Sequence, residues 1–226
     1  MKPLDNFCIG VAGGISVGKT HLCGEIVRRA KNRSISVRFL SYDRIRREIL
    51  QGVRIASFED VRGKLLKEFG SEIISEEGRL HLLRISEIIF QDREAFRLYN
   101  EIIDPQIIDV IRSESDRDSV NLVEWPTLVE RGLLPLFSGN LILVACSRRE
   151  QLRRLQGGDL SPLIVRRRLR LQGNLVSRCE ILRSKNHEDS LFSIFLSDTQ
   201  NLDRFCESFL DRLESTLEKL VIAEGL

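Results

Sequence analysis

Eight residues near the N-terminus have the types and spacing of a phosphate-binding loop. They are Gly13, Gly14, Ile15, Ser16, Val17, Gly18, Lys19 and Thr20, which read Gly-x4-Gly-Lys-Thr. Glycines let the backbone curl until several N–H groups face one anion. In such a loop the lysine reaches the β- and γ-phosphates of a nucleoside triphosphate, and the threonine hydroxyl binds Mg²⁺. The motif therefore predicts triphosphate binding, but it does not define the reaction.

The residues around this loop favour the same interpretation over a chance glycine-rich turn. An apolar run over 7–12 is typical of a buried parallel strand, and Leu22, Ile26 and Ala30 recur at helical spacing over 18–31. The predicted order of strand, loop and helix is the structural context that a functional phosphate-binding loop requires. The helix also directs its positive N-terminal end at the bound anion.

Two acidic residues follow predicted strands and are placed near the phosphate-binding loop. Asp43 comes after a strand predicted over 35–40, and Glu124 after one over 119–123. Ligands of open α/β sheets gather at the carboxyl ends of strands, so Asp43 could accept the proton of an attacking hydroxyl or order Mg²⁺, and Glu124 is placed near the same rim. Alternatively, Asp43 caps a helix that begins at Arg44, and Glu124 is a surface carboxylate. Arg47 could bind an acceptor phosphate or be solvated.

Two further regions differ in composition from the rest of the chain. Residues 57–113 carry apolar stripes at helical spacing, and Pro105 predicts a kink or break near Asp104. Residues 147–178 contain nine arginines and two acids, arranged around Gly157-Gly158 and Pro162. We interpret 53–113 as a helical acceptor-binding subdomain and 147–178 as an arginine-rich lid. A solvated basic face and an RNA-binding patch are the alternatives for the second region.

The chain as a whole suits a single intracellular α/β domain spanning residues 1–226. Its formal net charge of +2 gives no general argument for nucleic-acid or membrane binding. Five scattered cysteines indicate a reduced compartment, and no signal peptide or 18-residue apolar run is present, so we expect a cytoplasmic protein. Further strands over 140–146 and 190–196 and a helix over 202–222 complete a predicted five-stranded parallel sheet flanked by helices.

Several segments, taken in order, resemble the dephospho-CoA kinase family of P-loop kinases. The loop matches that family's Gly-Gly-Ile-x-x-Gly-Lys-[Ser/Thr], and the segment 41–47 partly matches its Asp-Ala-Asp-x-Ile-x-Arg. The family's Leu-Asn, His-Pro-x-Ile and Val-Pro-Leu-Leu-x-Glu are similar to segments 99–100, 104–107 and 125–130, and its Gln-x-x-Arg-Leu is found at 151–155. The resemblance covers almost the entire chain.

The resemblance implies a three-layer P-loop fold and ATP-dependent phosphorylation of the ribose 3′-hydroxyl of dephospho-CoA, assisted by Mg²⁺. It implies that Asp43 is the base, that Arg47 contacts the acceptor, and that Arg154 and Arg168 contact ATP. The chain departs from the family pattern at Ser41, at His81-Leu82, where an Asp-Arg pair is usual, and at Gly158, where a lid arginine is usual. A kinase for another hydroxyl acceptor and an ATP-binding protein without kinase activity therefore remain alternatives.

Overall fold

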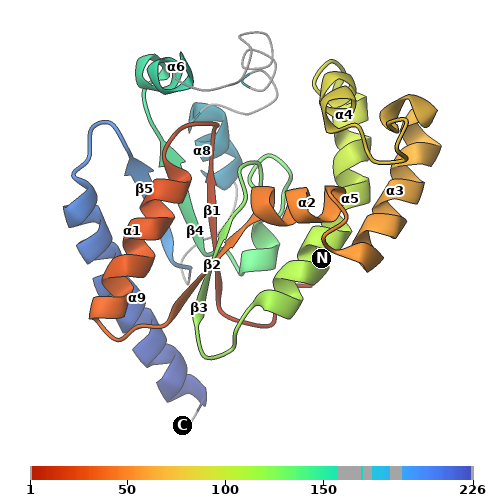
Figure 1. The fold of residues 1–226 in the computed structure, drawn as a ribbon. Helices are drawn as coiled ribbons and strands as arrows, with labels where there is room; N and C mark the ends of the chain where they lie inside the picture. Colours follow the sequence, from red (N-terminus) through yellow and green to blue (C-terminus); the bar gives the residue numbers. More distant parts are fainter. Residues whose placement is uncertain (1, 157–168, 170–174, 184–189, 225–226) are drawn as a thin grey trace. The chain divides into compact units, whose positions relative to one another are not determined.

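The fold is built on one parallel sheet of five strands, seen in the computed structural model of the chain (Figure 1). The structure describes residues 2–156, 169, 175–183 and 190–224. The strands are β1 (Cys8–Gly13), β2 (Val37–Ser41), β3 (Val120–Glu124), β4 (Leu141–Ala145) and β5 (Phe192–Leu196), in the order β2-β3-β1-β4-β5. With helices on both sides of the sheet, this architecture confirms the predicted fold class.

The described residues separate into two compact units. The first contains the sheet together with α1 (Lys19–Asn32), η2 (Leu134–Phe137), α6 (Arg148–Gln156), α8 (Leu175–Arg183) and α9 (Leu202–Glu224). The second is formed mainly by Leu40–Glu114 and contains α2 (Tyr42–Leu50), α3 (Ile55–Phe69), η1 (Ser71–Ile73), α4 (Leu82–Ile89) and α5 (Arg93–Glu114). The second unit is thus helical, as the apolar stripes predict.

Apolar side chains cover both faces of the central strands in the first unit. On one face, β1 and β4 pack against Leu22 and Ile26 of α1 and Phe209 of α9, all of which are fully or almost fully buried. On the other face, a side chain at Gly10 would lie only 2.9 Å from Leu128. Because the strands are buried on both faces, they read in sequence as continuous apolar runs.

Pro105 does not break its helix. α5 runs without interruption from Arg93 to Glu114 with Pro105 inside it, so the break near Asp104 that the sequence allowed does not occur. Proline removes one backbone hydrogen bond. The neighbouring Ile103, Ile107 and Ile108 are buried, and their packing compensates for the lost bond.

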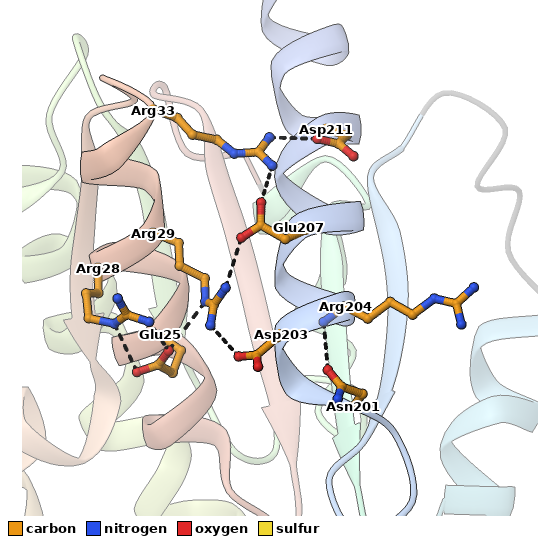
Figure 2. A network of polar contacts seen from close by, with 9 residues as sticks. All are labelled: Glu25, Arg28, Arg29, Arg33, Asn201, Asp203, Arg204, Glu207 and Asp211. Atoms are coloured by element: carbon orange, nitrogen blue, oxygen red, sulfur yellow. Dashed lines mark hydrogen bonds and ion pairs between the residues drawn. The ribbon is translucent and has the colours of Figure 1, made fainter.

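An ion-pair network joins α9 to α1, the helix that follows the phosphate-binding loop (Figure 2). Arg29 contacts Asp203, and its Nη1 lies 2.9 Å from Glu207. Arg33 also contacts Glu207, and it lies 2.7 Å from Asp211. Arg33 also lies 3.0 Å from Glu214. Arg29 of α1 and Arg33, which caps the end of α1, thus bind four acids of α9 and hold α9 beside α1; Figure 2 shows three of these acids.

Replacing Glu207 with glutamine should destabilise the protein at neutral pH. Hydrogen bonds from Arg33 and then Arg29 lower the pKa of Glu207 below its ordinary 4.5. A carboxyl whose pKa is lowered by folding stabilises the fold above its ordinary pKa and loses that effect as the pH falls. We therefore expect thermal unfolding of E207Q about 2 °C below wild type at pH 7, with the difference shrinking towards pH 4.

High salt should also reduce the difference in unfolding temperature between E207Q and wild type, because the side chains of the ion-pair network are solvent-accessible. Glu218 provides a matched control, since it is exposed on the same helix and has no ion-pair partner within the described part of the chain. The network would have no stabilising role if E207Q and E218Q unfolded at the same temperature across this pH range.

Candidate active site

The backbone of the loop at 13–20 requires glycine at two positions. A Cβ on Gly13 would lie 2.3 Å from the carbonyl oxygen of Val144 on β4, a distance that no side chain could accept. Gly18 has φ +98° and precedes the first residue of α1, Lys19. This left-handed conformation is costly for residues other than glycine. The two glycines therefore allow the chain to leave β1 and enter α1 through a tight curve.

Side chains from outside the loop bind the carbonyl oxygens along its outer side. Gln151 Nε2 donates to the carbonyl of Ile15 at 2.8 Å, and Arg154 Nη1 donates to that of Ser16 at 3.4 Å. Ser197 Oγ donates to the carbonyl of Val17 at 2.6 Å. Peptide carbonyl and N–H groups point in opposite directions, so this arrangement turns the N–H side of the loop inward. Inward-facing N–H groups form the concave nest that binds phosphate.

Lys19, Thr20 and Glu124 meet at the start of α1. Lys19 Nζ donates to the carbonyl of Gly14 at 2.8 Å and lies 4.0 Å from Glu124. The Thr20 hydroxyl lies 3.0 Å from each carboxylate oxygen of Glu124. Glu124 is only 7% exposed, so the interpretation of this residue as a surface carboxylate is wrong. The site brings together one cation and two oxygen ligands beside a nest of N–H groups.

Arg154 is placed against the loop by three sets of contacts. In addition to Ser16, it donates from Nη1 to Ser197 Oγ at 2.9 Å, and its Nε lies 2.7 Å from Glu150. Hydrogen bonds from Arg153 and Arg154 lower the pKa of Glu150 to about 2, so Glu150 is ionised at neutral pH. The structure thus brings Arg154 to the loop. Arg168 and Gly158 lie outside the described residues.

Asp43 and Arg47 belong to the second unit, on the first two turns of α2. The cap of this helix is Ser41, whose Oγ accepts from the Arg44 amide at 3.4 Å, so the interpretation of Asp43 as the capping residue is wrong. The Asp43 side chain is 56% exposed and lies 3.5 Å from Arg46. Arg47 is exposed and has no ion-pair or hydrogen-bond partner among the residues the structure describes.

Arg84, two residues beyond the position of the family pattern's arginine, forms ion pairs within the second unit. It contacts Glu72, and its Nη1 lies 3.2 Å from Glu87. His81 caps α4, because its Nδ1 accepts from the Arg84 amide at 3.2 Å. The family pattern's Asp-Arg pair is therefore replaced here by a helix cap and an apolar residue, Leu82.

The sequence alone did not reveal Gln151 and Ser197 as supports of the loop. Gln151 lies within the motif at 151–155 and Ser197 just beyond the strand predicted over 190–196, and neither position by itself indicates a contact with the loop. Both contacts span more than 130 positions along the chain. The sheet topology explains the contact, because Ser197 directly follows β5 at the same edge of the sheet where β1 leads into the loop.

Two features are absent from the described residues. None of the helices there has the length and apolar character that would let it cross a membrane. No group of three or more histidine, cysteine, aspartate or glutamate side chains is arranged there to hold a metal ion. A divalent cation at Thr20 and Glu124 would therefore need additional ligands from a bound phosphate and water, which is the usual mode for Mg²⁺.

Comparison with known proteins gives one consistent result. A family model described as dephospho-CoA kinase matches residues 7–181. A dephospho-CoA kinase of Fusobacterium nucleatum is 22% identical over 88% of this chain and 97% of its own length. One of Moorella thermoacetica is 27% identical over 76% and 79%. A crystal structure from Thermus thermophilus shares the fold with a TM-score of 0.61 at 21% identity, covering 94% of this chain and 99% of that one.

Proposed function

The chain belongs to the dephospho-CoA kinase family, whose members use ATP to phosphorylate dephospho-CoA to coenzyme A, and from this premise we propose how its own residues perform the transfer. The proposal assigns triphosphate binding to the loop, metal binding to Thr20 and Glu124, and proton removal to Asp43. The reacting hydroxyl is the ribose 3′-hydroxyl of the acceptor. The chemistry is mainly positioning and charge stabilisation, as in other phosphoryl transfers.

The observation that carries the proposal is the arrangement of Lys19, Thr20 and Glu124 beside the inward-facing N–H groups of the loop. The β-phosphate occupies the nest of N–H groups, and the Lys19 ammonium contacts the β- and γ-phosphates. Lys19 is 7% exposed, so its charge acts with little screening by water. Charge that develops on the transferring group is stabilised most by such fixed, buried cations.

The oxygen donors of Thr20 and Glu124 suit Mg²⁺. A hydroxyl and a carboxylate at 3.0 Å from one another are hard ligands, and each can serve a small divalent cation directly or through water. When bound, Mg²⁺ neutralises charge on the β- and γ-phosphate oxygens. Until ATP binds, Glu124 accepts the Thr20 hydrogen bond and holds that hydroxyl in place.

Replacing Glu124 with glutamine should weaken metal binding more than nucleotide binding. We expect roughly tenfold weaker Mg²⁺ affinity, measured by calorimetry as Mg²⁺-dependent binding of a non-hydrolysable ATP analogue. Binding of the analogue with EDTA present should change little, because the loop is intact. E124D, which keeps the charge, should recover part of the affinity. Equal Mg²⁺ affinity in wild type and E124Q would remove Glu124 from the metal site.

Asp43 is the proposed general base and Arg47 the proposed acceptor ligand. A carboxylate that is 56% exposed and is not used as the helix cap can accept a proton from a bound hydroxyl. Arg47 follows one turn later, and its guanidinium suits the diphosphate of the acceptor. The helices of 53–113 provide the remainder of the acceptor site in this proposal.

Arg154 and Arg168 are the proposed lid contacts to ATP. Support for Arg154 comes from its position against the loop carbonyl of Ser16. Closure over ATP would exchange part of its contact with Glu150 for a phosphoryl oxygen, and arginine geometry suits that exchange. The lid in this proposal covers 147–178.

The acceptor can be tested with a panel of hydroxyl compounds. Purified protein is incubated with ATP and Mg²⁺ together with dephospho-CoA, adenosine, pantothenate or no acceptor, and ADP release is followed with mass spectrometry of the product. We expect ADP release coupled to coenzyme A formation with dephospho-CoA alone. Turnover with another acceptor, or tight ATP binding without any turnover, would overturn the acceptor assignment. Several acceptors must be compared because Leu82 replaces the arginine usual in the family, and the nearby Arg84 is paired with Glu72 and Glu87.

A further inference from the structure

Arg46 is a charged residue of the second unit to which the mechanism above gives no role. It lies on α2 between Asp43 and Arg47, and its side chain is 29% exposed. One guanidinium nitrogen, Nη1, donates to the Tyr99 hydroxyl at 3.4 Å. The other, Nη2, donates to Asp43 Oδ1 at 3.5 Å. The guanidinium therefore bridges a carboxylate on α2 and a hydroxyl on α5.

The two ends of this bridge differ in mobility. Tyr99 is 2% exposed in the packed interior of the unit, whereas the Asp43 side chain is 56% exposed. An exposed aspartate has several accessible rotamers, and fixing it in one of them costs conformational entropy. Arg46 connects this side chain to a residue that packing already holds in place. The planar guanidinium suits the task, because its two nitrogens are held at a fixed angle.

We propose that Arg46 is a positioning residue, which holds the Asp43 carboxylate ready for proton removal by anchoring it to Tyr99. The proposal rests on the assignment of Asp43 as the base. Arg46 does not touch the substrate in this account. It acts by increasing the fraction of time that the Asp43 carboxylate spends in the productive orientation, which raises kcat and leaves nucleotide binding unchanged.

A second observation points to the same small region of the unit. The Tyr42 hydroxyl donates to Asp104 Oδ1 at 3.5 Å, and the two residues are 7% and 6% exposed. Tyr42 flanks Asp43 in sequence, so α2 is linked to α5 on either side of the aspartate. These two polar links fix the rotation of α2 about its axis, which an apolar contact alone would specify less strictly.

Arg44, a second arginine at the start of α2, provides a matched control. Arg44 lies 3.6 Å from Glu48 and 3.3 Å from Glu114, and among the described residues it makes no ion pair or hydrogen bond with the side chains of Asp43 or Tyr99. Replacing Arg44 removes the same charge from the same helix. R44A should therefore show the consequences of lost charge and lost surface ion pairs without affecting the orientation of Asp43.

The test is a set of steady-state kinetic measurements with a double-mutant cycle. R46A should lower kcat about tenfold with the KM for ATP and for dephospho-CoA within twofold of wild type, whereas R44A should keep kcat within twofold. Y99F should lower kcat about threefold in the presence of Arg46 and have no further effect in R46A, because both changes interrupt one chain of contacts. R46K should restore part of the loss.

Three outcomes would overturn the proposal. An unchanged kcat in R46A would show that Asp43 needs no anchor. A rise in the acceptor KM without a fall in kcat would make Arg46 a ligand of the acceptor. Additive effects of Y99F and R46A would show that the two do not act as one chain. D43N separates this proposal from the one it rests on. If D43N keeps full turnover the base assignment fails, and if only D43N loses turnover the positioning role alone fails.

Discussion

Replacing Lys19 with methionine is expected to lower kcat for phosphoryl transfer roughly 10³-fold, the largest effect of any single substitution in this chain. Methionine keeps an unbranched apolar stem of similar length but has no charge. Lys19 is only 7% exposed, so water would screen the negative charge of the phosphates poorly once the ammonium is removed. Turnover should be measured at saturating ATP and dephospho-CoA, so that weaker binding does not account for the loss.

The fold must be monitored in the same experiment, because Lys19 also neutralises Glu124 at 4.0 Å. Removing one member of a buried charge pair is destabilising in itself. Circular dichroism and the unfolding temperature of K19M should therefore be recorded beside those of K19M/E124Q, which removes both charges. A folded K19M with turnover within tenfold of wild type would contradict the role of Lys19 in the transition state.

Replacing Asp43 with asparagine is expected to lower kcat about 10²-fold, the usual contribution of a general base. Asparagine has almost the same shape, but it cannot accept the proton of the attacking hydroxyl. The side chain is 56% exposed and does not cap its helix, so the fold should be unaffected. The unfolding temperature and the affinity for ATP should therefore match those of wild type.

The pattern of loss in D43N distinguishes a base from a binding residue. A base contributes in the transition state, so kcat and kcat/KM for dephospho-CoA should fall together. A fall in kcat/KM alone would indicate that Asp43 binds the acceptor. The other acid on the same helix is Glu48. E48Q should keep kcat, because Glu48 is paired with Arg54 at 2.7 Å.

Most of the sheet could be predicted from the sequence because its three central strands, β3, β1 and β4, are buried on both faces. The run over 140–146 contains almost only apolar residues, and it corresponds to β4, Leu141–Ala145. For α5 the local sequence argues against a continuous helix, because Pro105 lies inside it. Tertiary packing of Ile103 and Ile107 determines the outcome there, and packing of that kind is not visible in the local sequence.

The candidate site divides in the same way between local and long-range features. The loop at 13–20 is a contiguous motif, so its residue types and order were sufficient to predict triphosphate binding. Contacts between residues distant in the chain were not predictable from local pattern. Ser197 reaches the loop from β5, and Tyr99 reaches Arg46 from α5. The burial of Glu124 likewise depends on neighbours that the strand prediction did not include.

The direct test of the central claim is formation of coenzyme A by the purified protein. Protein, ATP, Mg²⁺ and dephospho-CoA are combined, and the product is identified by mass spectrometry and by the phosphorus resonance of a 3′-phosphomonoester. We predict one coenzyme A formed per ADP released, at a rate about 10³-fold lower with K19M. Absence of coenzyme A from a folded protein that binds ATP would contradict the claim that this chain completes the transfer.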